Sequence, residues 1–380
     1  MRALIASSAT GGHIYPALAV AEEIKKRDAE AEILFVGAKW EIGKDIVKFA
    51  GYRQEFIDVR GFDRKNPFKA LAAMGAMLRA SGEIKKILRG FKPDICFGTG
   101  GHVAGPVIRA ARKAGVCTMI QEQNVIPGLA NKLAEKYADK VFAGFDAAVQ
   151  HFKDPGKVIV SGNPVRAGFS GAEERRAGAR KNIGVPEDAC CVLIFGGSQG
   201  ADAINDAVID MAAGFAGQEW QEGCYFIWIT GRQLFTGMRE RIESLFSEIP
   251  AGLAMVDYAD EIYDMYAAAD LIVSRAGALT VSEIALSSRA SILIPSPNVT
   301  NNHQYYNAKI LADAGAAILV PEGEIHEGGL AAPIRELTAA GPEKLKEMGR
   351  KAGLAAKPDA ARTIADEIEK LAGQGRSGQR

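Results

Sequence analysis

The chain has 380 residues, of which 48% are hydrophobic and 24% charged, enough apolar material for about two domains and too much for a disordered chain. Lysine plus arginine and aspartate plus glutamate each number 46, so the formal net charge is zero and nothing in the composition points to a nucleic-acid partner. The five cysteines form no Cys-x-x-Cys pair, which argues against a zinc site or a disulfide framework and fits free thiols in a reducing cytosol.

Short apolar runs alternate with amphipathic segments along the whole chain, and the helical segments include 17–27, 203–213 and 279–288. Nearly continuous apolar character is typical of parallel strands that helices cover on both faces. The sequence therefore predicts an α/β protein of doubly wound parallel sheets, with ligands at the carboxyl ends of the strands. The predicted strands are 2–7, 32–37, 94–98, 116–121, 140–143, 157–161, 191–195, 225–230, 253–256, 271–274, 291–295 and 316–320.

The alternation pauses once, at 162–186, where Asn163-Pro164, further glycines and a charged run suggest an interdomain linker. We predict a first domain over 1–162 and a second over 163–355. The remaining segment, 356–380, is expected to form a C-terminal helix that can pack back on the first domain and to end in a flexible tail.

The first chemical signal is the loop Ser8-Ala9-Thr10-Gly11-Gly12-His13, between a strand and a helix. Two glycines let the backbone approach a ligand, and the helix start offers unpaired N–H groups. His13 could accept a proton near neutral pH. The alternative is an ordinary strand–helix turn that a histidine caps.

Two further glycine-rich loops, 98–106 and 196–201, also follow predicted strands. Neither matches Gly-x-Gly-x-x-Gly, so neither is a dinucleotide fingerprint. Each is interpreted as a phosphate-facing loop or as tight packing between strand and helix. Three such loops in one chain favour binding.

A fourth signal is the run 274–283, in which a glycine-containing turn leads into the start of a helix, another place for an anion. Glu283 could accept two hydroxyl hydrogen bonds, as from a ribose, or could simply offset the helix dipole. Downstream, 301–307 is dense in amide and imidazole groups, which suits a sugar; a solvated turn and helix cap is the alternative.

Seven motifs in this order resemble the MurG family of bacterial undecaprenyl-diphospho-muramoylpentapeptide N-acetylglucosaminyltransferases. The resemblance runs from residue 1 to about residue 370. It implies a GT-B fold, two Rossmann-like domains facing across a cleft. It also implies inverting transfer of GlcNAc from UDP-GlcNAc to lipid I, forming lipid II. The motifs are Thr10–His13, Gly98–Pro106, Glu122–Asn124, Gly162–Arg166, Gly196–Ala201, Ser274–Glu283, and His303-Gln304 through Asn307-Ala308.

We favour His13, at the acceptor side of the cleft, as the general base. By resemblance, Arg166 meets the leaving diphosphate and Asn124 contacts the sugar or its acceptor. The resemblance also implies that Ala259 contacts the uracil through its backbone, Glu283 the ribose and Gln304 the GlcNAc hydroxyls. The acceptor side is expected to comprise Gly100, Gly101, His102 and Glu122. The predicted UDP-GlcNAc residues are Thr10, Gly11, Gly12, Asn124, Arg166, Ser198, Gly200, Ala259, Ala278, Leu279, Thr280, Val281, Ser282, Glu283 and Gln304.

The chain departs from the family pattern at four places. Ser8-Ala9 stands where Gly-Gly is usual, His102 where Tyr is usual, Gln121 where His is usual and Asn301 where Asp is frequent. His102 and Gln121 belong to the expected acceptor side, so these departures concern lipid recognition more than the reaction class.

No Asp-x-Asp occurs in the chain, so the metal-holding pair of many nucleotide-sugar transferases is missing. We expect no metal and no cofactor, UDP-GlcNAc being a co-substrate. Helix N-termini, backbone N–H groups and cations would then stabilise the leaving UDP.

A membrane contact is expected at 60–92, where nine Lys and Arg against one Asp and one Glu give a net charge of +7. They surround an apolar stretch, 67–78, that is too short to span a bilayer. Such a segment is typical of a helix lying on an anionic leaflet, and a basic helix face with its apolar side in a core is the alternative. We expect a peripheral protein on the cytoplasmic face of the bacterial plasma membrane, serving peptidoglycan synthesis, cell shape and division, with other cell-wall proteins as candidate partners.

Three other functions compete with this interpretation. An NAD-dependent oxidoreductase on two Rossmann halves is disfavoured by the missing Gly-x-Gly-x-x-Gly. A non-catalytic nucleotide-sugar scaffold would have no reason to keep His13. A GT-B transferase with another lipid acceptor is the alternative within enzymes.

Overall fold

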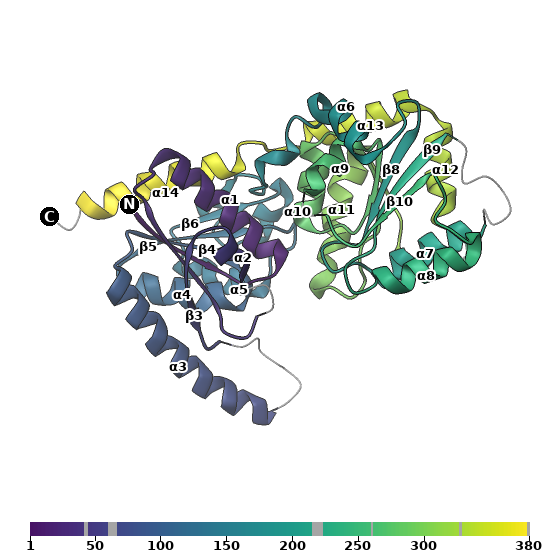
Figure 1. Cartoon of the computed structure of the whole chain (residues 1–380). Coiled ribbons are helices and arrows are strands. Elements are labelled where there is room, and N and C mark those ends of the chain that lie inside the picture. The colour runs from purple at the N-terminus through teal and green to yellow at the C-terminus, as the bar shows by residue number, and fades with distance from the viewer. Residues whose placement is uncertain (42–44, 60–66, 215–222, 260, 327–328, 378–380) are drawn as a thin grey trace. The chain divides into compact units, whose positions relative to one another are not determined.

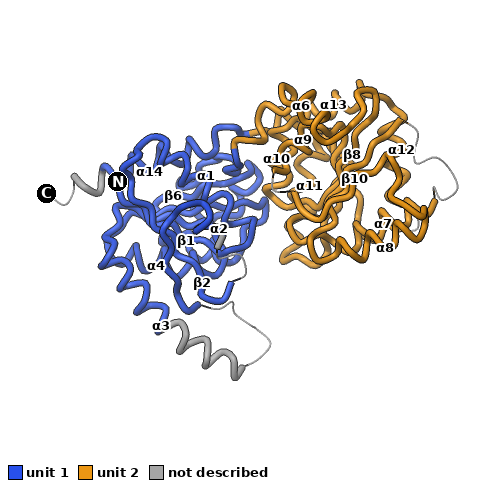
Figure 2. The backbone as a smooth tube through the Cα atoms, viewed as in Figure 1, with its two compact units in different colours: residues 1–166, 357–380 blue, residues 167–356 orange. Residues whose placement is uncertain are grey.

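The structure is a computed structural model of the chain (Figure 1), and it describes residues 1–41, 45–59, 67–214, 223–259, 261–326 and 329–377, with backbone alone at 45, 67–78 and 374–377. The chain divides into two compact units (Figure 2). Unit 1 comprises Met1–Arg166 and Lys357–Arg380, and unit 2 comprises Ala167–Ala356. The C-terminal segment thus returns to the first unit.

Unit 1 is built on a parallel sheet that has seven strands within the described residues, in the order β3-β2-β1-β4-β5-β6-β7. Its elements are β1 (Arg2–Ser7), α1 (Gly11–Arg27), β2 (Glu32–Ala38), α2 (Asp45–Phe49), β3 (Arg53–Ile57), α3 (Pro67–Phe91), β4 (Ile95–Gly100), α4 (Gly101–Lys113), β5 (Cys117–Glu122), α5 (Leu129–Ala134), η1 (Glu135–Tyr137), β6 (Lys140–Ala143), η2 (Asp146–His151), η3 (Pro155–Lys157), β7 (Val158–Val160) and α14 (Ala360–Ser377).

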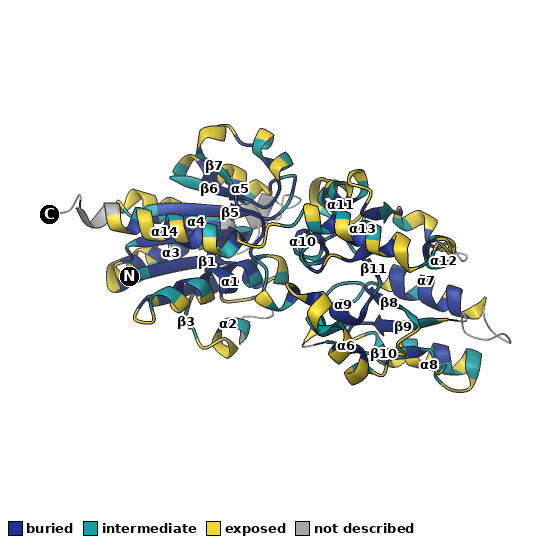
Figure 3. Cartoon of the chain, turned by 90° about the horizontal axis from the view of Figure 1, so that it is seen from above, coloured by how far each residue is buried: buried dark blue, intermediate teal, exposed yellow. Residues whose placement is uncertain are grey.

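Both faces of this sheet are covered, as the continuous apolar strands predict. In β1, Leu4 and Ala6 point into a core shared with α3 and α4, whereas Ala3 and Ile5 point into a second core with α1 and α14. Figure 3 shows the strands buried between helices whose outer faces are exposed. The predicted doubly wound class is confirmed.

The C-terminal helix α14 packs beside α1 in unit 1 (Figure 1). Ile364 and Ile368 are fully buried in the core that α1 also lines. At the surface, Arg27 donates to Asp366 at 2.6 Å and to the carbonyl oxygen of Arg362 at 3.2 Å. A helix separated from α1 by more than 300 residues thus completes the first core.

Strand β3 was not predicted from the sequence. In β3, Arg53 and Glu55 are exposed, Gln54 and Phe56 are half-buried and Ile57 is buried. The strand lies at the edge of the sheet and pairs with β2. An edge strand needs no continuous apolar run, so the pattern that identified the other strands is absent there.

Unit 2 is built on a second parallel sheet, with six strands among the described residues, in the order β10-β9-β8-β11-β12-β13. Its elements are η4 (Ala167–Phe169), α6 (Ala172–Ile183), β8 (Cys190–Phe195), α7 (Asp202–Ala213), β9 (Cys224–Ile229), α8 (Phe235–Phe246), β10 (Leu253–Val256), α9 (Ile262–Ala268), β11 (Leu271–Ser274), α10 (Ala278–Leu286), β12 (Ala290–Leu293), η5 (Thr300–Asn302), α11 (His303–Asp313), β13 (Ala317–Leu319), η6 (Glu322–Glu324), α12 (Ala331–Ala339) and α13 (Pro342–Leu354).

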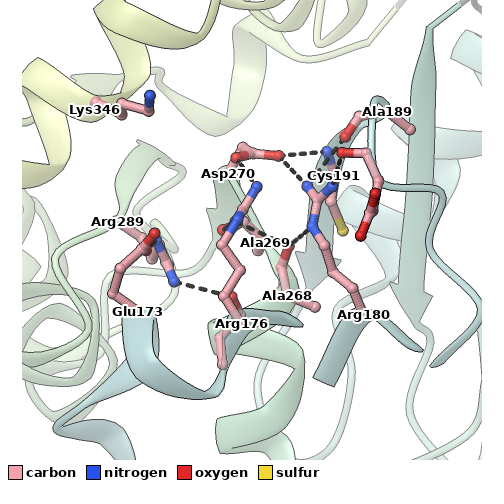
Figure 4. Close-up of polar contacts among 12 residues, drawn as sticks. Glu173, Arg176, Arg180, Ala189, Cys191, Ala268, Ala269, Asp270, Arg289 and Lys346 are labelled. Carbon is pink, nitrogen blue, oxygen red and sulfur yellow. Dashed lines mark hydrogen bonds and ion pairs between the residues drawn. The ribbon is translucent and has the colours of Figure 1, made fainter. Parts of the chain in front are cut away.

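About half of the segment predicted as a linker, 12 of its 25 residues, is helix α6, which belongs to unit 2. Asp270, at the start of β11, accepts from Arg176 at 2.5 Å and from Arg180 at 2.6 Å (Figure 4). Arg180 is only 5% exposed and also donates to the carbonyl oxygens of Ala268 and Ala189. Because charges rather than an apolar face anchor α6, its charged sequence was mistaken for a linker.

Helix α3 covers the basic and apolar segment 60–92 only in part. Residues 60–66 lie outside the described residues, as do the side chains of 67–78. In the described final turns, the apolar Ala80, Ile84 and Leu88 are buried in the unit 1 core, and Lys85 and Lys86 are exposed. Within the described residues, no helix combines the length and apolarity needed to cross a membrane.

Candidate functional site

In each unit, two of the predicted loops flank the point where the strand order reverses. In unit 1, chain order runs outward from β1 on one side and from β4 on the other, so the loops after β1 and β4 adjoin. In unit 2, the same holds for the loops after β8 and β11. Open parallel sheets bind ligands at this switch point. Four loops found by their glycines are therefore placed in two candidate sites.

The first loop of unit 1 leads into helix α1, and no side chain of the N-cap residue bonds to the backbone N–H groups at the start of this helix. Thr10 is the N-cap residue, but its side chain makes no capping hydrogen bond, and both Thr10 and Gly12 are exposed. The first turn contains no acidic residue. The first turn of α1 thus supplies no carboxylate of its own to offset the helix dipole, and its positive end suits an anionic ligand.

His13 does not cap this turn with its side chain. Its Nδ1 lies 3.1 Å from Oε1 of Gln123, which comes directly after β5. Burial lowers the pKa of His13, while Glu122, the bond to Gln123, the Thr99 carbonyl and Glu41 act in the opposite direction. Because burial is the largest cause, the neutral imidazole is favoured near pH 7, the form that a general base requires.

The glycines of the second loop allow the β4 turn to approach His13. Gly100 and Gly101 have φ values of +110° and +73°. A Cβ at Gly100 would lie 2.9 Å from Cε1 of His13, and one at Gly101 would lie 1.9 Å from Oγ of Ser8. Their presence is thus explained by packing between the two loops, whether or not they also contact an acceptor.

Glu122 holds the loop after β5 together. It is 1% exposed, and its two oxygens accept from the backbone N–H groups of Asn124 and Gly128 and from the side-chain amides of Asn124 and Asn131, at 2.9 to 3.1 Å. This geometry supports a shaping role. A direct contact between Glu122 and an acceptor stays a prediction.

Two departures from the family pattern meet in unit 1. Nδ1 of His102 lies 3.5 Å from Oγ of Ser8, and its Nε2 lies 3.6 Å from Glu41. Glu41 also accepts from the backbone N–H of Ala9 at 2.9 Å. The Ser8-Ala9 and His102 replacements therefore belong to one cluster beside the first loop.

Two predicted residues of unit 1 remain, Asn124 after β5 and Arg166. Asn124 is half-buried and is oriented by Glu122. The guanidinium carbon of Arg166 lies 5.0 Å from the centre of the Tyr15 ring, a cation–π geometry. Tyr15 is on α1, two residues after His13, so Arg166 lies near the first loop.

In unit 2, the loop after β8 is formed by tight backbone packing. Gly200 has a φ of +80°, and a Cβ there would lie 2.2 Å from the carbonyl oxygen of Thr230. Gly231 fits against Gln199 in the same way. Ser198 at the tip is exposed. Two strand ends thus fix a loop whose tip faces solvent, just before helix α7.

The loop after β11 leads into helix α10, whose N-cap residue is Gly277. No acidic residue occupies its first turn, which contains Leu279 and Thr280. Glu283, one turn further, accepts from the hydroxyl of Tyr266 at 3.2 Å. The predicted residues of this loop, Ala278, Leu279, Thr280, Val281, Ser282 and Glu283, therefore form one helix start in which the carboxylate is oriented by a tyrosine.

Gln304 and Ala259 are the last predicted site residues of unit 2, and Asn301 is one of the departures from the family pattern. Oε1 of Gln304, on α11, accepts from the backbone N–H of Ser296 at 2.9 Å, which fixes the loop after β12. Asn301 has a φ of +56°, a conformation that asparagine tolerates well. Ala259 is half-buried in the loop after β10 and adjoins residue 260, which lies outside the described residues.

Three residues for which the sequence predicted no individual role position these sites. Gln123 contacts His13, Glu41 joins the first loop to His102, and Tyr266 orients Glu283. The amide-rich run 121–124 after a strand was a signal for Gln123; nothing comparable marks Glu41 or Tyr266. Among the described residues, no three His, Cys, Asp or Glu side chains gather as metal ligands.

Comparison with known proteins agrees with this architecture. Residues 4–143 match the glycosyltransferase family 28 N-terminal domain, and residues 191–364 match the family 28 C-terminal domain. The UDP-N-acetylglucosamine–N-acetylmuramyl-(pentapeptide) pyrophosphoryl-undecaprenol N-acetylglucosamine transferase of Thermoanaerobacter sp. is 37% identical over 371 residues, 98% of this chain and 100% of that protein.

Two solved structures extend the comparison. MurG of Acinetobacter baumannii aligns with a TM-score of 0.75 and 27% identity, covering 97% of this chain and 99% of that one. UDP-GlcNAc 2-epimerase from Neisseria meningitidis aligns with a TM-score of 0.69, 97% and 100% coverage and 14% identity, which shows a shared fold alone. The chain therefore belongs to glycosyltransferase family 28 and, within it, to the MurG family.

Proposed function

We propose that this protein transfers GlcNAc from UDP-GlcNAc to the muramoyl sugar of undecaprenyl-diphospho-MurNAc-pentapeptide, lipid I, with inversion, and so forms lipid II for peptidoglycan synthesis. The observation that carries the proposal is similarity over nearly the full length to a relative with this activity in its name. The placement of His13 and of the glycine-rich loops at the two switch points supports it.

In the proposed step, His13 removes the proton of the acceptor hydroxyl as its oxygen attacks the anomeric carbon of GlcNAc. The bond from that carbon to the diphosphate oxygen breaks, and UDP leaves with the electron pair. His13 then releases its proton to water. The lowered pKa of His13 supports this role, because a base must be unprotonated when the acceptor arrives.

The leaving diphosphate would be stabilised by preorganised donors. The starts of α7 and α10, beside Ser198, Gly200 and Thr280, offer backbone N–H groups. The positive dipole end of α10 has no acidic residue in its first turn, whereas Asp202 offsets the dipole at the start of α7. Arg166 would add a cation. This set would do the work of a metal ion, and we propose that neither a metal nor a cofactor is required.

The other proposed contacts follow the donor from base to sugar. Ala259 would contact the uracil, Glu283 the ribose hydroxyls and Gln304 the GlcNAc hydroxyls. The bond from Tyr266 supports the ribose contact, because it holds the Glu283 carboxylate in one orientation. Asn124, Thr10, Gly11 and Gly12 would bind on the unit 1 side, with Gly100, Gly101 and His102 toward the acceptor.

We also propose that segment 60–92 docks the protein on the cytoplasmic face of the bacterial plasma membrane. The support is its net charge of +7 and the exposure of Lys85, Lys86 and Arg89 on the described part of α3. A role in cell shape and division, with other cell-wall proteins as partners, would follow from making lipid II.

The proposed function is tested by incubating the protein with labelled UDP-GlcNAc and a lipid I analogue and identifying the product. We expect label in a lipid-linked disaccharide with the inverted anomeric configuration. Transfer only to a different polyprenyl acceptor would favour the alternative lipid substrate. Nucleotide-sugar binding without transfer would favour a scaffold, and binding of a nicotinamide cofactor would favour an oxidoreductase.

A further inference from the structure

The carbonyl oxygen of Thr99 fixes the orientation of the Gln123 side chain. Gln123 is 2% exposed, and its Nε2 lies 2.7 Å from the carbonyl oxygen of Thr99. A backbone carbonyl only accepts hydrogen bonds, so the amide nitrogen must face Thr99. The other amide atom, Oε1, is therefore the one directed at Nδ1 of His13, 3.1 Å away.

A second amide secures the first. Nε2 of Gln123 also donates to Oε1 of Gln121, which is buried. Nε2 of Gln121 in turn donates to Oδ1 of Asn163 at 2.9 Å and to the carbonyl oxygen of Glu122 at 3.2 Å. Nδ2 of Asn163 returns to the carbonyl oxygen of Gln123 at 3.0 Å. Rotating the Gln123 amide would set its oxygen against two acceptors, Gln121 and Thr99.

We propose that Gln123 is a positioning residue that holds neutral His13 in the tautomer with its proton on Nδ1, which leaves Nε2 to take the proton of the acceptor. An amide oxygen accepts a hydrogen bond but supplies no proton, so Nδ1 must carry the hydrogen. The inference rests on the proposed function, in which His13 is the base.

The packing of the ring agrees with a fixed orientation. The imidazole lies against Gly100 and Gly101, where an added Cβ would come within 2.9 Å of Cε1 and 3.3 Å of Cδ2. The Thr99 carbonyl also favours a protonated nitrogen on this ring. The residue at 121 is where the resembling family usually has histidine, so this chain builds the support of its base from amides.

The tautomer is measured directly on the full-length protein by nitrogen-15 NMR after selective labelling of its histidines. The chain has five histidines, and His13→Gln identifies the signals of His13. At a pH where His13 is neutral, we expect a protonated Nδ1 and an unprotonated Nε2. A proton on Nε2 in the wild type would overturn the inference, whatever the activity.

Gln123→Met keeps the shape of the side chain and removes both hydrogen-bonding atoms. We expect the His13 signals to shift toward the Nε2-protonated form. We expect kcat to fall at least about tenfold, which is a part of the 10²–10⁴-fold contribution of a general base. The KM for UDP-GlcNAc should stay within about twofold, because the change acts on the base. The matched control is Gln150→Met, at an exposed residue whose amide bonds only to Ala147 among the described residues, and we expect no change.

A folded Gln123→Met protein that keeps the wild-type tautomer would overturn the role of Gln123. If a thermal melt shows that this variant does not fold, Gln123→Asn replaces it, because it keeps the amide and shortens its reach by one methylene; it must give the same shift in tautomer. A wild-type protein that transfers no GlcNAc would refute the proposed function and leave the tautomer result standing, so the two failures are distinct.

Discussion

Replacing Asp270 by alanine should destabilise unit 2 far more than removing an ordinary surface carboxylate. Asp270 accepts from Arg176, Arg180 and the backbone N–H of Cys191, at 2.5 to 2.8 Å. Arg180 is only 5% exposed, so Asp270→Ala leaves its charge buried without the carboxylate. Breaking a buried ion pair in this way typically costs about 3–5 kcal/mol.

The lower end of that range applies here. The side chain of Asp270 is 22% exposed, and Arg180 keeps bonds to the carbonyl oxygens of Ala268, Pro186 and Ala189. We therefore expect a loss of about 3 kcal/mol in the free energy of unfolding. For a unit of this size, about 2–4 °C per kcal/mol converts this loss to a fall of roughly 6–12 °C in the melting temperature of unit 2.

The assay is thermal and urea unfolding of the full chain, with and without UDP to identify the transition of unit 2. The matched control is Asp313→Ala, which removes a 2.6 Å pair with Lys309 whose side chains are 51% and 62% exposed. Such an exposed pair contributes little to stability, because solvent screens the two charges. Equal destabilisation by the two substitutions would refute the argument that burial of Arg180 decides the cost.

Four further predictions concern the proposed chemistry. Turnover should fall as the pH drops through the pKa of His13, because protonation removes the base, and burial places that pKa below the ordinary value of about 6.5. A pH profile of kcat whose acid-side midpoint lies above pH 7 would contradict this. Gly200→Ala should weaken UDP binding and lower the free energy of unfolding by more than about 1 kcal/mol, because φ is +80° and the new Cβ meets Thr230. The control Gly178→Ala, in open space on α6, should raise the free energy of unfolding by up to about 1 kcal/mol; calorimetry measures UDP binding and thermal melts measure stability. Exhaustive chelation should leave turnover unchanged, and a loss that one particular metal restores would refute metal independence. Lys85→Gln with Lys86→Gln should weaken binding to anionic vesicles, measured by flotation, by about 1 kcal/mol per charge removed, without changing UDP affinity, and Lys309→Gln on unit 2 is the control. Vesicle binding that depends neither on salt concentration nor on these two charges would refute electrostatic docking.

Much of the fold follows from the sequence because local patterns and the tertiary structure agree. Buried parallel strands require continuous apolar runs, and these runs located every strand but β3 to within a residue or two. The glycines that follow β1, β4 and β8 identified the loops, since only glycine permits the close approaches seen at Gly101 and Gly200.

Only the tertiary structure decides which of these loops meet. Strand order is set by nonlocal pairing, so the neighbouring positions of β1 and β4, or of β8 and β11, are not written in any short stretch of sequence. The same holds for Gln123 and His13, which are 110 residues apart. Helix α6 was mistaken for a linker because its partner, Asp270, is about 90 residues away, and β3 was missed because an edge strand is held by its neighbour rather than by an apolar run of its own. Local patterns thus determined the elements and the residue types of the candidate sites, whereas pairing between distant residues decided their geometry.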